Sequence, residues 1–171
     1  VGDVLLRYIA TEPFVQTEKF LFKKTPLTAK LLGNPSIKPG LVFGERGPER
    51  FIHPLSEEEG HFSGNVYLLT SNKTYSAANS FAWTFKVCGI GSVIGEETGG
   101  MNVSFGDYLS YTLPISGLKC SISMKRFWHF RADENNIHGV IPDICVPASD
   151  ALGEALKLIG KHKKPHKRGN R

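Results

Sequence analysis

The residues of this sequence whose types and spacing could do chemistry lie between Thr74 and Ala78, in the order Thr-Tyr-Ser-Ala-Ala. A continuous apolar run, residues 66–70, precedes them, and apolar residues at helical spacing follow. Ser76 is therefore predicted to stand where a buried strand turns into a helix. Its hydroxyl would lie at the carboxyl edge of a sheet, where α/β proteins tend to place their sites. The free N–H groups and positive dipole end of the helix could stabilise an oxyanion there.

The same serine has a structural interpretation. A serine that precedes a helix is most often an N-cap, whose hydroxyl accepts a hydrogen bond from the first helical turn. On this segment alone the cap is favoured. The functional interpretation, a nucleophile that forms an acyl-enzyme, needs a base to take the hydroxyl proton.

Few side chains elsewhere in the sequence offer that base. His129 and His138 could serve, although a partly buried strand histidine and a surface histidine are the simpler interpretations. Lys73, three residues before the serine, is most simply a solvated loop charge. The six histidines and three cysteines lack the spacing of metal ligands, so no metal or other cofactor is expected. Each cysteine lies in an apolar run and is predicted to be a small core residue.

Elements of regular spacing must position the serine. The expected helix, residues 76–88, has a core-facing stripe consisting of Ala77, Ala78, Phe81, Phe85 and Cys88. A second buried strand, residues 92–95, and a glycine-rich turn, residues 96–100, follow it. This β-α-β succession with an added hairpin predicts the mixed α/β class.

The remaining segments are assigned from local pattern. A short helix is expected at residues 4–10 with Asp3 as its N-cap, and a final helix after Asp150 with Leu152, Leu156 and Ile159 as its apolar stripe. Proline and glycine density in residues 11–64 predicts loops and short pieces, with a possible strand at 20–22. A hairpin is expected from strands 108–113 and 118–124, and a last strand at 140–147.

Length and charge limit the classes of function. The 171 residues are enough for one domain, and no apolar run is long enough for a membrane span. The net charge is +5, but residues 161–171 hold six lysines and arginines and no acid. Residues 1–160 then carry a charge near zero, so no nucleic-acid partner is expected. Residues 161–171 are predicted to be a disordered basic tail.

Five short motifs occur in one order with no spare length between them: G-N-V-Y-L-L-T-S at 64–71, T-x-S-A-A at 74–78, V-I-G-E-E-T-G-G at 93–100, L-P at 113–114 and G-V-I-P-D-I-x-V at 139–146. This series resembles the C-terminal-processing (tail-specific) serine peptidases, over about residues 60–160. The resemblance implies a Clp protease/crotonase-like β-β-α superhelix, of which residues 1–160 are the C-terminal part. It also implies that Ser76 attacks the peptide carbonyl, with the Ala77 amide as one oxyanion donor.

Two departures from the family pattern concern the base. Where lysine-dyad members carry their lysine, this sequence has Met101, which cannot accept a proton. Tricorn-like members use an upstream histidine supported by a late carboxylate. Glu134 could fill that supporting role, or be an exposed turn acid; the nearer family position is Asn136. The base and part of the oxyanion hole are therefore expected in an N-terminal half that this sequence lacks.

The function predicted from this resemblance is a serine endopeptidase that binds extended peptides by edge addition to a strand. A non-catalytic binding module on the same scaffold stays open because no base is visible, and a crotonase-like acyl-CoA enzyme ranks lower. Residues 1–171 alone are expected to be inactive and prone to self-association through unpaired strand edges. The resemblance implies a periplasmic or extracellular location.

Overall fold

The computed structural model describes residues 2–162. In chain order its elements are α1 (Gly2–Ile9), β1 (Thr17–Lys24), α2 (Pro26–Leu31), β2 (Gly40–Glu45), a 3-10 turn η1 (Pro48–Arg50), β3 (Tyr67–Thr70), α3 (Ser76–Val87), β4 (Ser92–Gly95), β5 (Val103–Thr112), β6 (Lys119–His129), β7 (Ile144–Cys145) and α4 (Ala151–His162). No helix among these combines the length and apolar character needed to cross a bilayer.

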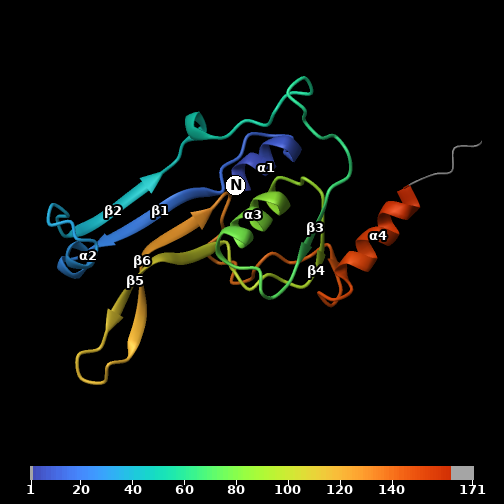
Figure 1. Ribbon diagram of the computed structural model, residues 1–171. Coiled ribbons are helices and arrows are strands. Elements are labelled where there is room, and N and C mark those ends of the chain that lie inside the picture. The colour runs from blue at the N-terminus through green and yellow to red at the C-terminus, as the bar shows by residue number, and fades with distance from the viewer. Residues whose placement is uncertain (1, 163–171) are drawn as a thin grey trace, which may run out of the picture.

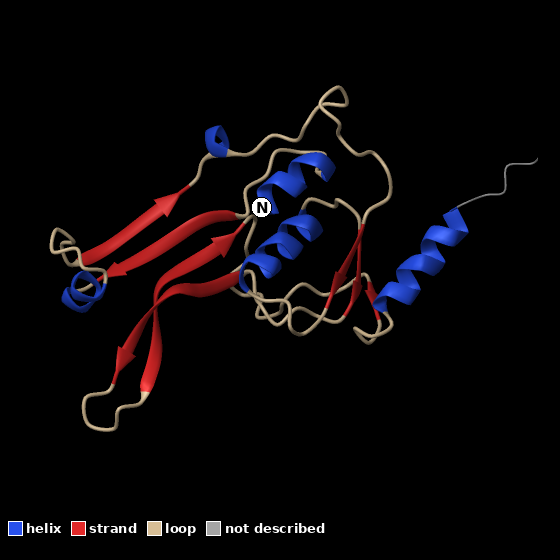
Figure 2. Cartoon of the chain, in the orientation of Figure 1, coloured by secondary structure: helices blue, strands red, loops and turns tan. Residues whose placement is uncertain are grey.

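The strands form two sheets (Figures 1 and 2). One is antiparallel with the strand order β2-β1-β6-β5, and the other is parallel with the order β3-β4-β7. Figure 1 shows α1 and α3 between the antiparallel sheet on one side and the parallel sheet on the other. The β5–β6 hairpin projects away from the body, and α4 follows the parallel sheet. The mixed α/β class predicted from the sequence is confirmed.

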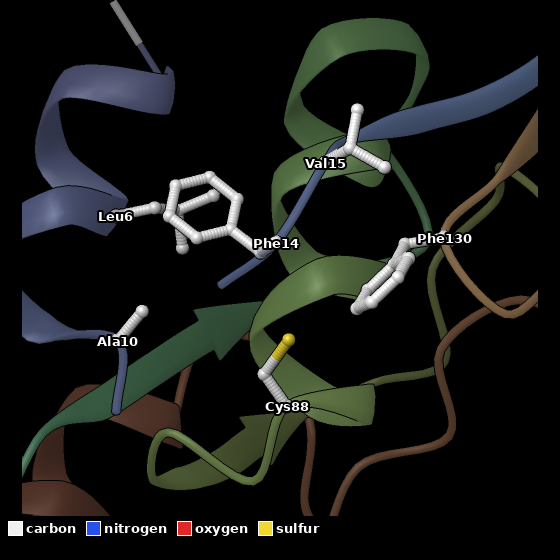
Figure 3. Close-up of a cluster of buried hydrophobic side chains, with 6 residues drawn as sticks. All are labelled: Leu6, Ala10, Phe14, Val15, Cys88 and Phe130. Carbon is white, nitrogen blue, oxygen red and sulfur yellow. The ribbon is translucent and has the colours of Figure 1, made fainter. Parts of the chain in front are cut away.

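The core follows the period-two alternation of the parallel sheet. Val93 in β4 packs with α3 residues such as Phe85, whereas its neighbour Ile94 packs with Ala151 and Ala155 of α4. The two helices thus cover opposite faces of β4. A further cluster joins α1 to the end of α3 and to the segments that flank the antiparallel sheet (Figure 3), through Leu6, Ala10, Phe14, Val15, Cys88 and Phe130.

The prediction of loops and short pieces over residues 11–64 is correct in kind, because the elements there are three to eight residues long, but it missed the sheet that two of them join. The segment contains α2 and two strands of the antiparallel sheet, and the possible strand at 20–22 lies inside β1. Phe20 of β1 pairs with Phe127 of β6 and with Gly44 of β2. Phe127 lies more than a hundred residues from Phe20 along the chain, so this strand pairing leaves no pattern in the local sequence.

Several predicted strands have different bounds or burial. β3 is not buried on both faces, because Leu69 is exposed. The last strand is only two residues long, since it lies between Pro142 and Pro147, which lack the N–H that a ladder needs. The hairpin strands are longer than expected: β5 and β6 continue past the predicted segments to Val103 and His129.

The helices also differ in detail. α1 begins at Gly2, so Asp3 lies in its first turn and accepts a hydrogen bond from Gln16 Nε2 (2.6 Å) rather than capping the helix. The predicted stripe of α4 is exposed, whereas alanines form its buried face. Its last residues, 161 and 162, belong to the predicted tail. Residues 163–171 lie outside the described part of the chain.

The predicted stripe of α3 is only partly correct. Phe85 and Cys88 are buried, but Ala77 and Ala78 are exposed and the polar Asn79 takes their place in the core. Burial raises the pKa of the Cys88 thiol to about 11, so it stays protonated. The core assignment fails for Cys145, which is exposed, and Cys120 is half-buried.

Asp143 in the G-V-x-P-D motif ties α3 to the parallel sheet. Its carboxylate binds Lys86 Nζ of α3 and accepts a hydrogen bond from the Val93 N–H of β4 (2.8 Å). Burial raises the pKa of this carboxyl, but the Lys86 and Val93 contacts outweigh it and leave the pKa below the ordinary value. The motif therefore has a structural role: it fixes α3 over the strand that runs beside β3.

Candidate active site

Ser76 is the first residue of α3, and its backbone is strained. Its φ angle is 53°, in the left-handed region that non-glycine residues rarely adopt. The side chain is exposed, and its hydroxyl forms no hydrogen bond with another residue in 2–162. A strained strand-to-helix turn that exposes a serine hydroxyl is a geometry by which hydrolases present a nucleophile.

The geometry does not support the N-cap interpretation of Ser76. The cap position is Tyr75, whose side chain makes no capping hydrogen bond, and its carbonyl accepts the first helix bonds, from Ala78 N–H (3.1 Å) and Asn79 N–H (3.3 Å). Within the described residues, the N–H of Ala77 has no backbone acceptor. It lies directly after Ser76 at the positive end of the helix, which is where an oxyanion donor is needed.

The glycine-rich turn packs under the serine turn. Gly100 N–H donates to the Thr74 carbonyl (3.1 Å), two residues before Ser76. A Cβ on Gly99 would collide with the Tyr75 ring, and one on Gly100 would collide with the Asn79 side chain. Only glycine fits at these two positions. The close packing of the glycine-rich turn therefore fixes where Ser76 lies relative to the sheet.

A buried polar network holds the two turns together. The Asn79 amide donates through Nδ2 to the Met101 carbonyl (3.0 Å), and its Oδ1 accepts from the Thr98 hydroxyl (2.7 Å). The Thr98 oxygen in turn accepts from Val140 N–H (2.7 Å), at the start of the G-V-x-P-D motif. Sequence reasoning missed Asn79 and Thr98 as site residues. The available signal was a polar residue on the core-facing side of a helix.

A hollow of about 590 Å³ opens beside Ser76. It is lined by the starts of α1 and β1, by the first turn of α3, and by the facing residues of β5 and β6. Ser76, Ala77, Gly100 and His129 are all among its lining residues. The hollow is large enough for part of an extended peptide to reach the serine.

His129, the last residue of β6, is the histidine that the structure brings to this hollow. It is buried, and its Nδ1 lies 3.2 Å from the Gln16 carbonyl oxygen. Because a carbonyl only accepts, Nδ1 carries the proton and Nε2 keeps its lone pair. Burial lowers the pKa of His129, and the bond to Gln16 offsets only part of that effect. The ring is thus neutral at pH 7.

The other predicted candidates lie elsewhere. Glu134 accepts a hydrogen bond from Trp128 Nε1 (2.5 Å), pairs with Arg126 (3.5 Å), and lines a different hollow. His138 is exposed, with Nδ1 3.2 Å from a carboxylate oxygen of Glu97. The structure therefore brings Ser76, Ala77 and His129 to one hollow and does not bring Glu134 or His138 there.

Met101 and Lys73 do not line the hollow either. The Met101 side chain is exposed beyond the glycine-rich turn, and only its backbone carbonyl takes part in the Asn79 network. Lys73 is exposed in the loop between β3 and α3. Neither side chain forms a hydrogen bond with Ser76 among the described residues, and a methionine side chain cannot accept a proton.

Comparison with known proteins identifies the family of this chain. The model of peptidase family S41 matches residues 18–146. Solved structures with a similar fold include mature CPAF (16% identity, TM-score 0.57, 94% of this chain and 40% of that chain) and a protein named as a peptidase from Parabacteroides merdae (20%, 0.50, 99% and 49%). A protein named as an S41 protease from Bacteroides fragilis also matches (13% identity, TM-score 0.50, 95% of this chain and 41% of that chain).

The chain spans less than half the length of these structures, and at such identities they show the fold alone. With three quarters of its residues matched by the family model, this chain belongs to peptidase family S41.

Proposed function

We propose that this chain is part of a serine-type endopeptidase of the tricorn-like kind, in which Ser76 forms an acyl-enzyme with the substrate peptide. One observation carries the proposal. The exposed Ser76 hydroxyl stands on a turn with φ 53°, beside the unpaired Ala77 N–H, at a hollow of about 590 Å³. Membership of a peptidase family supports peptide or protein substrates.

The chemistry follows from these positions. A base takes the Ser76 proton as Oγ attacks the carbonyl carbon of the scissile peptide bond. The carbonyl oxygen becomes an oxyanion, which the Ala77 N–H stabilises by a hydrogen bond. The C–N bond then breaks, the amine leaves with the transferred proton, and the acyl group stays on Oγ. Water, deprotonated by the same base, attacks the acyl carbon and releases the acid and the Ser76 hydroxyl.

The proposed base comes from a part of the protein outside residues 1–171. Met101 occupies the position of the family's dyad lysine, and His138 pairs with Glu97 away from the hollow. No described residue forms a hydrogen bond with the Ser76 hydroxyl that would mark it as the base. A supporting role for Glu134 stays a prediction, because Trp128 and Arg126 now hold its carboxylate outside the hollow.

The experiment is Ser76→Ala in the longer protein, with peptide hydrolysis and fluorophosphonate labelling as readouts. Loss of a nucleophile costs on the order of a millionfold in turnover in well-studied serine proteases. Ser110→Ala is the matched control, since Ser110 is an exposed serine on β5 that does not line the hollow. It should leave both readouts unchanged. Activity of Ser76→Ala within about tenfold of the parent would exclude Ser76 as nucleophile.

A binding module on the same scaffold is the second candidate. It is favoured by one observation, the absence of a base bonded to Ser76 among residues 2–162. Such a module would bind an extended peptide by strand addition without cleaving it. The two functions separate in the labelling experiment, because a binding module would not react with the fluorophosphonate at Ser76. An envelope or extracellular location stays a prediction from the family resemblance.

A further inference from the structure

The end of the hairpin formed by β1 and β2 is strongly basic. Residues 23–41, which we call the β1–β2 tip, comprise the end of β1, α2, the loop after α2 and the start of β2. The tip holds no aspartate or glutamate but four lysines: Lys23, Lys24, Lys30 and Lys38. Within residues 2–162 none of these lysines pairs with a carboxylate, whereas Lys19, nearer the start of β1, pairs with Glu45 (3.1 Å). The tip therefore carries uncompensated positive charge at neutral pH.

The short helix α2 in this tip is inverted relative to an ordinary surface helix. Its polar Thr28 is 3% exposed, and the hydroxyl of Thr25 accepts a hydrogen bond from the Thr28 N–H (3.0 Å) and lies 2.9 Å from the Thr28 hydroxyl. Its leucines are exposed instead: Leu27 by 37%, Leu31 by 38% and, directly after the helix, Leu32 by 44%. A helix at the surface of a globular protein normally turns its apolar side to the core. The outward leucines of α2 indicate an apolar partner.

The apolar surface of the tip continues beyond the helix. Leu41, at the start of β2, is 67% exposed, and its partner across the strand pair is Lys23. A hollow of about 540 Å³ opens between α2 and the loop that follows it. Apart from Lys30, the residues that line this hollow are apolar or glycine: Pro26, Ala29, Gly33, Pro35, Ile37 and Pro39. Exposed apolar side chains and lysines are thus interleaved throughout the tip.

A lipid bilayer with anionic headgroups matches this combination of side chains. Burial against a protein core would desolvate each ammonium group, at a cost that only a paired carboxylate offsets. An acidic peptide or a nucleic acid would satisfy the lysines but leave the leucines in water. At a bilayer surface the leucines enter the boundary between headgroups and acyl chains, while the lysines extend to the phosphates. Figure 1 shows α2 at the end of the hairpin away from α1 and α3, so the tip stands clear of the packed helices.

We propose that the β1–β2 tip binds the surface of a bilayer that contains anionic phospholipids. Leu27, Leu31 and Leu32 lie at the acyl boundary, and the four lysines of the tip contact the headgroup phosphates. The binding is peripheral, because the inserted part is one short helix and its flanking loop. This inference does not rest on the proposed function, since the tip contributes no residue to the lining of the Ser76 hollow.

Vesicle sedimentation of the longer protein tests this binding without any use of activity. The protein should sediment with vesicles of equimolar phosphatidylcholine and phosphatidylglycerol, and bind vesicles of phosphatidylcholine alone about tenfold or more weakly. The double variants Leu27→Gln/Leu31→Gln and Lys30→Gln/Lys38→Gln should each weaken binding to the mixed vesicles by about tenfold or more. All four side chains are exposed, so both variants should keep the parent's midpoint of urea denaturation.

The β5–β6 hairpin supplies the matched controls. Its loop also exposes apolar side chains, Ile115 and Leu118, but Lys119 is the one charged residue between Asp107 and Lys125. Ile115→Gln/Leu118→Gln and Lys119→Gln should leave vesicle binding unchanged. Loss of binding in these controls, with binding retained in the variants of the tip, would place the lipid contact on the β5–β6 hairpin and overturn the inference.

Other outcomes separate lipid from a protein occupant and from the proposed function. Equal binding to both kinds of vesicle, or to neither, would overturn the inference. If neither binds, slow alkylation of Leu31→Cys relative to Ile115→Cys would show that another part of the protein, or a second copy, covers the tip. Binding by a protein that shows no Ser76-dependent hydrolysis would leave this inference standing and overturn the peptidase proposal alone.

Discussion

A single backbone angle decides how Ser76 can act. With φ at 53°, the residue turns the chain from β3 into α3 within one step and leaves its hydroxyl exposed. A left-handed conformation costs a non-glycine residue about 1–2 kcal/mol, so glycine would be the more stable choice at this position. A serine there is consistent with a site at which function outweighs local stability.

The strain predicts an order of stability between two variants that lack the Ser76 hydroxyl. Ser76→Gly removes both the hydroxyl and the Cβ, whereas Ser76→Ala removes only the hydroxyl. Because only alanine keeps the left-handed penalty, we expect the glycine variant to be the more stable by about 1 kcal/mol. Urea denaturation of the two variants measures the difference. An alanine variant as stable as the glycine variant would show that the turn is relaxed.

His129 makes the stability of the fold depend on pH. Burial lowers its pKa in the folded state below the ordinary value near 6.5, so the unfolded chain binds the proton more readily. The contribution of neutral His129 to the free energy of unfolding is complete above pH 6.5. It is lost as the pH falls from 6.5 through the lower pKa of His129 in the folded state. We expect the free energy of unfolding to fall over this interval, by less in His129→Gln. A slope in His129→Gln equal to that of the parent would contradict the assignment.

At the scale of elements, the geometry of the candidate active site depends on how α3 packs against the glycine-rich turn. The first turn of α3 and the glycine-rich turn lie apart in the sequence. Four groups join them through hydrogen bonds: the Asn79 amide, the Thr98 hydroxyl, the Met101 carbonyl and the Val140 N–H. Asn79 and Thr98 are buried, so each unmade bond would leave a desolvated polar group. The network therefore fixes Ser76 relative to the hollow from within the core.

Removal of this network should lower both stability and activity. Asn79→Ala leaves the Met101 carbonyl without its side-chain donor and leaves the Thr98 hydroxyl with only the Gly100 carbonyl (3.0 Å) as acceptor, so we expect a cost of about 1–3 kcal/mol in the free energy of unfolding. Peptide hydrolysis should fall even where the variant is still folded, because the serine turn loses its support. Asn135→Ala, at an exposed position, should cost less than about 0.5 kcal/mol. Equal stability of the two variants would show that the network is unimportant.

At the scale of the molecule, two sheets with open edges meet around α1 and α3 (Figure 1). The antiparallel sheet ends at β5, whose hairpin with β6 projects from the body, and the parallel sheet ends at β3. Ser76 lies on the turn between the parallel sheet and α3, and its hollow reaches across to β5 and β6. Ser76 is therefore presented by one sheet, and its hollow extends to the other.

Residues 1–171 alone are expected not to hydrolyse peptides. A serine hydroxyl is a poor nucleophile without a base within hydrogen-bond reach, and Ser76 has none among the described residues. One oxyanion donor from outside this chain would add a further loss of about 3–4 kcal/mol in transition-state stabilisation. A quenched-peptide assay, with Ser76→Ala as the background, measures the activity. Clear Ser76-dependent cleavage would place the base inside this chain, and His129 would be the residue to mutate next.

Features set by neighbouring residues were predictable from the sequence. The path from β3 through Ser76 into α3, the strand β4 and the glycine-rich turn all lie within residues 67–100, where apolar period and glycine position are sufficient. The order of the motifs also predicted the family, which the match over residues 18–146 confirms.

Features that depend on partners far along the chain were decided by the tertiary structure. β1 and β2 are strands because β6 pairs with β1, and no local pattern encodes that pairing. The first turn of α3 is exposed at the hollow, so Asn79 is buried in place of the predicted alanines. His129 reaches the Ser76 hollow only because β6 runs beside β1. Local sequence thus determined which elements exist around the serine, and long-range packing decided which side chains face it.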